Sequence, residues 1–149
     1  ISPDTVAFRE TRDKHFLIET PEGKPRILEW WNGYSAALDL TNPEALQWLK
    51  AQLDDLQELG IDGFKFDAGD SIYYTEGDKM HKQVTTDELS RLWAAFGEQY
   101  AFNELRVCFK TGGYSLMQRN EGNRNLQRRN RKRSDRSSKL QQRAVTGNR

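Results

Sequence analysis

The chain has 149 residues, a formal net charge of +1 and a single cysteine. A chain of this length suits one ordinary domain. One cysteine excludes an intramolecular disulfide framework and any zinc site built from several cysteines. No stretch approaches the roughly 18 consecutive apolar residues of a membrane span, and the first residues lack the pattern of a signal peptide, so we expect no membrane partner.

The net charge is an average over two unlike parts. Residues 120–149 carry ten Lys or Arg against two acidic residues, a charge of +8, which leaves −7 for residues 1–119. Every aromatic residue lies before position 115. Because the C-terminal part has few large apolar residues, it cannot offset the roughly 1–2 kcal/mol per residue that ordering a backbone costs. We therefore predict a globular part in residues 1–119 and a basic, low-complexity, disordered tail in residues 120–149.

The first predicted elements lie in the N-terminal third of the chain. Residues 9–26 contain many charges, two prolines and a glycine, and this composition predicts a long loop or an exposed hairpin. Residues 36–40 have the pattern of a short strand. A helix should follow, because Asn42 is a good N-cap, Pro43 suits the first helical position and leucines recur at helical spacing. Gly60 is expected to end this helix.

Two more strands and one more helix follow. Residues 61–67 are predicted to form a strand, and a capping-box pattern at residues 85–88 predicts the start of a helix. Residues 105–109 are predicted to form the next strand. Strands that alternate with helices indicate a parallel α/β fold with right-handed crossovers.

The strand at residues 61–67 carries the residues of greatest chemical interest. Side chains alternate along a strand, so Phe64 and Phe66 should pack under the helices while Lys65 and Asp67 share the opposite face. Ligands of parallel α/β folds bind at the C-terminal ends of the strands, where Asp67 lies. A structural ion pair or a solvated strand end is the alternative interpretation. For Asp70, in the loop that follows, a turn or capping role is the default.

Other candidate residues are less informative. Trp30, Trp31 and Tyr34 could stack on a sugar ring, although such aromatic clusters more often belong to a core. His15 and His81 have no partner at the spacing of metal ligands, so we expect no metal site.

Several blocks of the sequence resemble a known family. They are residues 32–43, residues 60–70 at a distance of one helix, residues 103–110 and residues 112–119. In this order they resemble the catalytic barrel of glycoside hydrolase family 31, which includes α-glucosidases, α-galactosidases and α-xylosidases. The last two blocks are most similar to the α-galactosidase-like branch.

This resemblance implies a fold and a reaction. The fold would be a partial TIM (β/α)8 barrel, followed here by the basic tail. The reaction would be hydrolysis of an O-glycosyl bond in an α-linked oligosaccharide or glycoside with retention of configuration, by two carboxylates and without a cofactor. The resemblance implies that Asp67 is the nucleophile and that Lys65, Trp31 and Arg119 line the substrate pocket.

The chain also departs from the family pattern. The general acid of the family lies on a later strand, and none of the nearby carboxylates Asp70, Glu76, Asp78 and Glu104 matches its position. A whole barrel takes about 250 residues, so residues 1–119 would supply less than half of it, and we expect an inactive fragment. After Arg119 the family pattern ends abruptly, which indicates that the tail is an out-of-frame translation or the product of a truncated gene model and not an evolved module.

Two other functions stay open at this stage. The ten cations of the tail could contact phosphates of a nucleic acid, but no aromatic stacking residues are interleaved with them, so this is the weaker hypothesis. The chain could also be a sugar-binding remnant without catalysis. The sequence leaves the sugar, the linkage, the compartment and the oligomeric state open.

Overall fold

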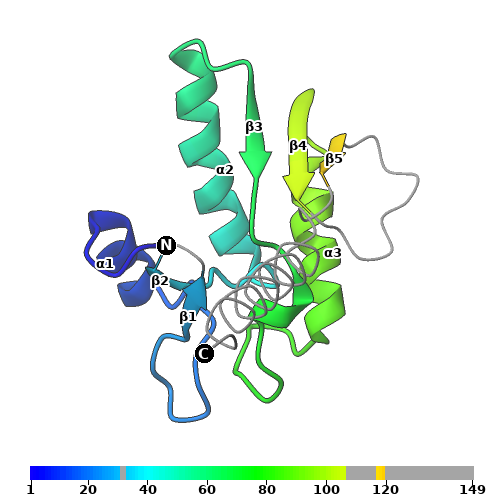
Figure 1. Ribbon diagram of the computed structural model, residues 1–149. Coiled ribbons are helices and arrows are strands. Elements are labelled where there is room, and N and C mark those ends of the chain that lie inside the picture. The colour runs from blue at the N-terminus through cyan, green and yellow to red at the C-terminus, as the bar shows by residue number, and fades with distance from the viewer. Residues whose placement is uncertain (31–32, 107–116, 120–149) are drawn as a thin grey trace, which may run out of the picture. The chain divides into compact units, whose positions relative to one another are not determined.

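The computed structural model describes residues 1–30, 33–106 and 117–119 (Figure 1). These residues lie in one compact unit, Ile1–Arg119. The elements in chain order are α1 (Val6–Asp13), β1 (Ile27–Trp30), β2 (Gly33–Ala36), α2 (Pro43–Glu58), β3 (Gly63–Phe66), the 3-10 turn η1 (Ser71–Tyr73), α3 (Thr86–Gly97), β4 (Phe102–Arg106) and β5 (Met117–Arg119).

The strands β3, β4 and β5 form a parallel sheet in that order. Figure 1 shows β3 and β4 pointing the same way, with α2 and α3 beside them. In the β3–β4 pair, Lys65 lies opposite Glu104 and Phe66 opposite Leu105. Gly63 permits the close approach of the strands, since a Cβ there would lie 2.0 Å from the carbonyl oxygen of Phe102. The prediction of parallel strands joined by helices is confirmed for β3, α3 and β4.

An aromatic core fills the space between this sheet and its helices. Its buried members are Phe66, Ala94, Phe96, Tyr100 and Leu105, and the partly buried residues packed against them are Leu46, Leu49, Leu53, Phe64 and Trp93. The ring of Phe66 lies edge-on to that of Trp93, with centroids 5.3 Å apart. This confirms that Phe64 and Phe66 pack under the helices, and it leaves the other face of β3 for the polar side chains.

The caps that predicted α2 and α3 are present in the structure. The side chain of Asn42 accepts hydrogen bonds from the backbone N–H groups of Glu44 at 2.9 Å and Ala45 at 3.4 Å. The hydroxyl of Thr85 accepts from the N–H of Glu88 at 3.2 Å. Each cap satisfies donors that the first turn of a helix leaves unpaired, so both helices begin where these residues indicate.

The N-terminal region differs from the prediction of a long loop. Residues 9–13 belong to α1, whose first turn is capped by the hydroxyl of Thr5. Leu17 and Ile18 are buried, and the N–H of Ile18 donates to the carbonyl oxygen of Ala37 at 2.9 Å. The loop prediction is therefore wrong at α1 and at the buried residues 16–18, whereas the hairpin alternative agrees with the exposed residues 21–24 and the antiparallel bridge between Glu19 and Pro25.

The predicted strand at residues 36–40 is displaced. β2 ends at Ala36 and pairs antiparallel with β1, an unexpected hairpin. Beyond it, Leu38 forms only an isolated bridge with Leu17. The strand predicted at residues 105–109 begins earlier, at Phe102, and residues 107–109 lie outside the described part of the chain. The tail of residues 120–149 also lies outside it, so its character stays a prediction.

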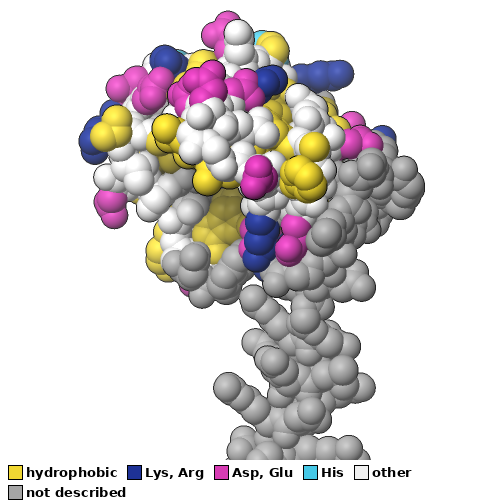
Figure 2. All heavy atoms as spheres, turned by 90° about the horizontal axis from the view of Figure 1, so that it is seen from above, with side chains coloured by type: hydrophobic (Ala, Val, Ile, Leu, Met, Phe, Trp, Pro, Cys, Tyr) yellow, Lys and Arg dark blue, Asp and Glu magenta, His cyan; other side chains and the backbone are white. Residues whose placement is uncertain are grey.

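Exposed hydrophobic side chains gather at the end of the sheet opposite Asp67. Figure 2 looks onto the end where α2 finishes and β3 and β4 begin, and it shows hydrophobic side chains among acidic and basic ones. Leu59, Ile61 and Phe102 are exposed there, Leu59 by 82%. Within the described residues, no helix combines the length and apolar character that crossing a membrane requires.

Candidate active site

Asp67 stands directly after β3, at the C-terminal end of the parallel strand. Its side chain is 28% exposed, and its Oδ1 accepts a hydrogen bond from the N–H of Ala68 at 2.9 Å. Ala68 has φ of 60°, a left-handed conformation that costs a residue with a Cβ roughly 1–2 kcal/mol. Such strain persists only where the surroundings enforce it, and it concentrates at functional sites. The backbone thus turns sharply immediately after the carboxylate.

The next residue reinforces this turn. A Cβ on Gly69 would lie 1.9 Å from Cδ1 of Trp93, so only glycine fits against the indole ring. Trp93 belongs to α3 and stacks on Phe96 with ring planes 6° apart. The loop after Asp67 therefore rests on the aromatic core, and the core fixes where the carboxylate lies.

Arg106, the last residue of β4, binds two carboxylates. Its Nε lies 2.8 Å from Oδ1 of Asp67, and its Nη2 lies 2.8 Å from Oδ2 of Asp70. Nη2 also contacts the hydroxyl of Tyr73 at 3.4 Å. Arg106 is 5% exposed and Asp70 is 8% exposed. The guanidinium is therefore a buried cation that bridges the strand end to the loop after it.

The surroundings of this cluster change the protonation of its members. Burial alone would lower the pKa of Arg106. The hydrogen bonds with Tyr73 and Asp70, together with the negative charges of Asp67 and Asp70, outweigh this effect and raise the pKa of Arg106. Burial, and then the charge of Asp70, raises the pKa of the Tyr74 hydroxyl to about 12. The site therefore keeps a permanent cation and a neutral phenol in a poorly solvated region.

Lys65 flanks Asp67 on its open side. The Nζ of Lys65 lies 3.6 Å from Oδ2 of Asp67, and the lysine side chain is 47% exposed. The two residues share one face of β3, as the alternation predicts. The ammonium group is more exposed to solvent than expected for a residue in the interior of a barrel, and it is accessible to a ligand.

A cavity of about 240 Å³ lies beside Asp67. Asp67 and Ala68 form one side of it, and the aromatic residues Trp30, Tyr74 and Trp93 contribute to its lining. The ring of Trp30 lies 5.0 Å from that of Tyr73. An acidic group on an otherwise mostly apolar wall is a common arrangement in small-molecule sites. Trp31, the tryptophan expected in the pocket, lies outside the described residues.

Arg119 lies on β5, directly opposite Arg106 on β4. The structure describes only the backbone there, so the predicted contribution of Arg119 to a pocket stays a prediction. Arg106 itself was not among the predicted site residues. The β3–β4 register pairs Phe66 with Leu105, so the next step along both strands brings Asp67 beside Arg106. Opposite charges at matching strand ends could have suggested this pair.

The nearby carboxylates have different environments. Asp70 is bound by Arg106, and Asp78, 2% exposed, forms a two-pronged ion pair with Arg26. Glu104 lies opposite Lys65 in the sheet, and Glu76 is exposed. Nothing in these environments singles out one of them as a proton donor to a leaving group. Among the residues that the structure describes, no group of three or more His, Cys, Asp or Glu side chains could hold a metal ion.

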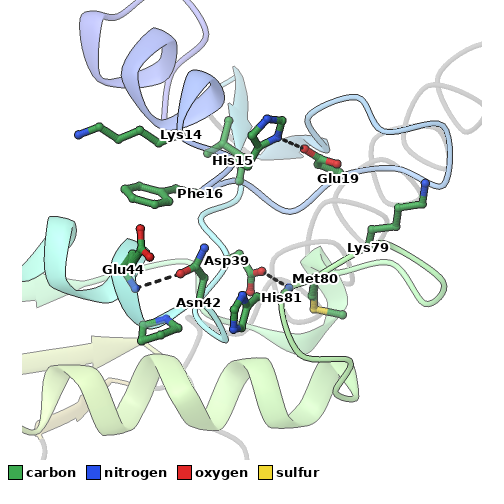
Figure 3. Close-up of a pocket in the computed structure, with 12 residues that line it drawn as sticks. Lys14, His15, Phe16, Glu19, Asp39, Asn42, Glu44, Lys79, Met80 and His81 are labelled. Atoms are coloured by element: carbon green, nitrogen blue, oxygen red, sulfur yellow. Dashed lines mark hydrogen bonds and ion pairs between the residues drawn. The ribbon is translucent and has the colours of Figure 1, made fainter.

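A second cavity, of about 410 Å³, lies near the start of α2. Figure 3 shows side chains from the end of α1, the start of α2 and the loop before α3 around it. Asp39 is buried there and accepts hydrogen bonds from the N–H and hydroxyl of Thr41 and from the N–H of His81. His15 and Glu19 contact each other at 3.1 Å. Asp39 thus joins two loops, which is a structural role.

Asp67 and Arg106 meet at the C-terminal ends of two parallel strands that are joined by a helix, which is the end of the strands where β/α barrels carry their ligand sites. The chain matches the TIM-barrel domain of the glycosyl hydrolases family 31 over residues 1–147, and it belongs to this family. The resemblance stated from the sequence is therefore confirmed, and the described strands are part of a TIM barrel.

Individual relatives agree with this assignment. The chain is 28% identical over 119 residues to the myogenesis-regulating glycosidase of Mus musculus, a match that covers 77% of this chain and 17% of the relative. It is 34% identical over 74 residues to the α-xylosidase XylQ of Lactiplantibacillus pentosus, a match that covers 48% of this chain and 9% of the relative. The solved family 31 sulfoquinovosidase from E. rectale has a similar fold, with a TM-score of 0.63 at 21% identity, over 78% of this chain and 19% of that one.

Proposed function

We propose that this chain provides the nucleophile of a retaining α-glycosidase, with Asp67 as the attacking carboxylate. The observation that carries the proposal is the position of Asp67 at the C-terminal end of β3, partly exposed beside a cavity and held by Arg106 at 2.8 Å. Two cations, Arg106 and Lys65, lie beside this carboxylate, and an ionised carboxylate is the form that attacks. Lys65, Trp31 and Arg119 complete the substrate pocket in this proposal.

The reaction would proceed in two displacements. In the first, Asp67 forms a bond to the anomeric carbon while the glycosidic C–O bond breaks, and a second carboxylic acid protonates the departing oxygen. In the second, water attacks the anomeric carbon, the ester to Asp67 breaks, and the same second carboxylate removes the proton of the water. We assign this second carboxylate to none of Asp70, Glu76, Asp78 and Glu104.

The substrate we propose is an α-linked oligosaccharide or glycoside. Lys65 supports this choice, because an ammonium group 3.6 Å from Asp67 and half exposed can donate hydrogen bonds to sugar hydroxyls. By their names, two of these relatives are an α-xylosidase and a sulfoquinovosidase, so sugar specificity differs within the family. A panel of α-galactosides, α-glucosides, α-xylosides and α-sulfoquinovosides would therefore identify the sugar.

The test is covalent labelling of the full-length gene product. A mechanism-based fluoro-sugar of the preferred series should attach to Asp67, which peptide mass spectrometry can locate. Asp67→Asn should lower turnover by at least about 10³-fold, since the variant lacks the nucleophile. Asp54→Asn is the matched control, because Asp54 is also paired with a lysine, Lys50, but lies exposed on α2. Normal turnover of the Asp67 variant, or a label on another carboxylate, would refute the assignment.

We also propose that residues 1–149 on their own hydrolyse no glycoside. The reason is that, among the described carboxylates near Asp67, none matches the position of the family's general acid. Turnover by the purified 149-residue chain, lost in Asp67→Asn, would contradict this part of the proposal. The fragment should also show no binding of α-galactosides or α-glucosides in calorimetry.

A further inference from the structure

The two oxygens of Asp67 have unequal surroundings. Oδ1 lies 2.8 Å from Nε of Arg106 and accepts the hydrogen bond of Ala68 at 2.9 Å. For Oδ2 the described residues offer only the Nζ of Lys65, at 3.6 Å. An oxygen that accepts one N–H and also lies 2.8 Å from a guanidinium nitrogen is the weaker nucleophile of the pair. Oδ2 is therefore the oxygen left for attack.

Arg106 depends on Asp70 for its own position. Its guanidinium is buried, and a buried cation must be paired because leaving it without a partner is costly. Nε faces Asp67 while Nη2 faces Asp70 and Tyr73, so the planar group is held from two sides. A planar fork bound at both ends fixes its plane, which a lysine at this position would not do.

The charge balance explains why two carboxylates are present. Asp67 and Asp70 together balance Arg106 and Lys65. When Asp67 forms an ester with the sugar it becomes neutral, and Arg106 would lose one of the carboxylates that bind it among the described residues. Asp70 remains charged and paired through this step, so the buried guanidinium keeps a counter-ion in both states of the site.

We propose that Asp70 is a positioning residue that holds Arg106 against Oδ1 of Asp67, so that Oδ2 is presented to the anomeric carbon. The inference rests on the proposed function of Asp67. Asp70 acts through Arg106 and touches no substrate, since it is 8% exposed and is absent from the lining of the cavity beside Asp67. This also distinguishes Asp70 from a general acid, which must reach the leaving oxygen.

The kinetic test compares two leaving groups in the full-length gene product. The dinitrophenolate of a dinitrophenyl glycoside leaves without being protonated, whereas the methoxide of a methyl glycoside must be protonated by a general acid as it leaves. Asp70→Asn should lower kcat roughly 10²-fold with both substrates, because the nucleophile is misplaced in each case. KM should stay within about twofold, and added azide should restore nothing. A loss confined to the methyl glycoside, or rescue by azide, would show that Asp70 is the general acid and overturn the inference.

Asp78→Asn is the matched control. Asp78 is also a buried carboxylate bound by an arginine, Arg26, but this pair joins two loops outside the site. Its loss should lower the melting temperature and leave kcat unchanged. If Asp70→Asn does not fold, Tyr73→Phe removes a weaker contact of Arg106 and should lower kcat several-fold, again equally with both leaving groups. Unequal losses with Tyr73→Phe would count against the inference.

A crystal structure of Asp70→Asn gives a readout that needs no turnover. The distance from Arg106 Nε to Asp67 Oδ1, 2.8 Å here, should increase beyond about 3.5 Å in the variant, where a contact of this kind no longer exists. An unchanged distance would overturn the inference whatever the kinetics show. If the wild-type protein hydrolyses no glycoside, the proposed function is refuted. The role of Asp70 is then decided by the distance from Arg106 Nε to Asp67 Oδ1 alone.

Discussion

Gly69 shows how closely one residue of the site is fitted to its surroundings. A Cβ at this position would lie 1.9 Å from Cδ1 of Trp93 and within 3 Å of two more indole atoms. Gly69→Ala should therefore destabilise the protein by about 1–3 kcal/mol, because the ring or the loop must shift. The shift would also displace Asp67, two residues away. Urea unfolding of the wild type and the variant measures the change.

Gly77→Ala is the control for the loss of a glycine. Gly77 has φ of 88°, and no atom lies within 4 Å of the place where a Cβ would stand, so this substitution adds backbone strain and no clash. Its cost should be about 1 kcal/mol, and the turnover of the full-length gene product should not change. Equal unfolding midpoints for Gly69→Ala and the wild type would show that Trp93 moves aside freely.

For single residues, the sequence predicts the features that depend on one strand alone. It does not predict the contacts that depend on how two strands pair. Alternation along β3 is sufficient to place Lys65 and Asp67 on one face. The partnership of Asp67 with Arg106 depends on the register of β4, which is set by distant packing, including the contact of Gly63 with Phe102. The opposite charges at the two strand ends hint at the pair, but the sequence around Arg106 does not fix the register that brings them together.

Among the elements, α2 depends on a single N-cap residue for its first turn. The side chain of Asn42 accepts from two backbone N–H groups, and Asn42→Ala would leave both to water. The free energy of unfolding should fall by about 1 kcal/mol, measured by chemical denaturation. Asn42→Asp retains an accepting oxygen and should lose much less. A loss as large in Asn42→Asp as in Asn42→Ala would show that the cap is not the cause.

The elements differ in how far local sequence determines them. α2 and α3 have caps and an apolar stripe of their own, so their prediction succeeds. α1 has only eight residues, and a helix this short is stable mainly through its packing. The cap at Thr5 is a local signal for it, but the apolar pattern after that residue is too short to confirm a helix. The β1–β2 hairpin was missed because its paired strands are only four residues long.

At the scale of the molecule, the aromatic core connects the fold to the site. Trp93 packs on Phe66 and on the position of Gly69, while Leu105 and Phe66 pair between the strands that end in Arg106 and Asp67. The same interior that stabilises the sheet therefore determines where the carboxylate and its cation meet. Composition predicts that a core of this kind exists, but its contacts follow only from the assembled fold.

Tyr74, which is partly buried against the core, makes the stability of the whole molecule depend on pH in alkaline solution. Burial, and then the charge of Asp70, raises the pKa of this phenol to about 12 in the folded protein, against about 10 in an unfolded chain. Between these values the folded state holds a proton that the unfolded state has released. The stabilisation is fully present below pH 10 and is lost as the pH rises through 12.

The wild type should therefore lose about 2 kcal/mol more stability between pH 10 and pH 12 than Tyr74→Phe, which has no phenol to ionise. Urea unfolding at intervals of half a pH unit measures the difference. Tyr34→Phe, at an exposed tyrosine of β2, controls for the loss of one hydroxyl and should follow the wild type. Parallel stability curves for the wild type and Tyr74→Phe would mean that the phenol is hydrated in solution, and that the wall of the cavity beside Asp67 opens to water.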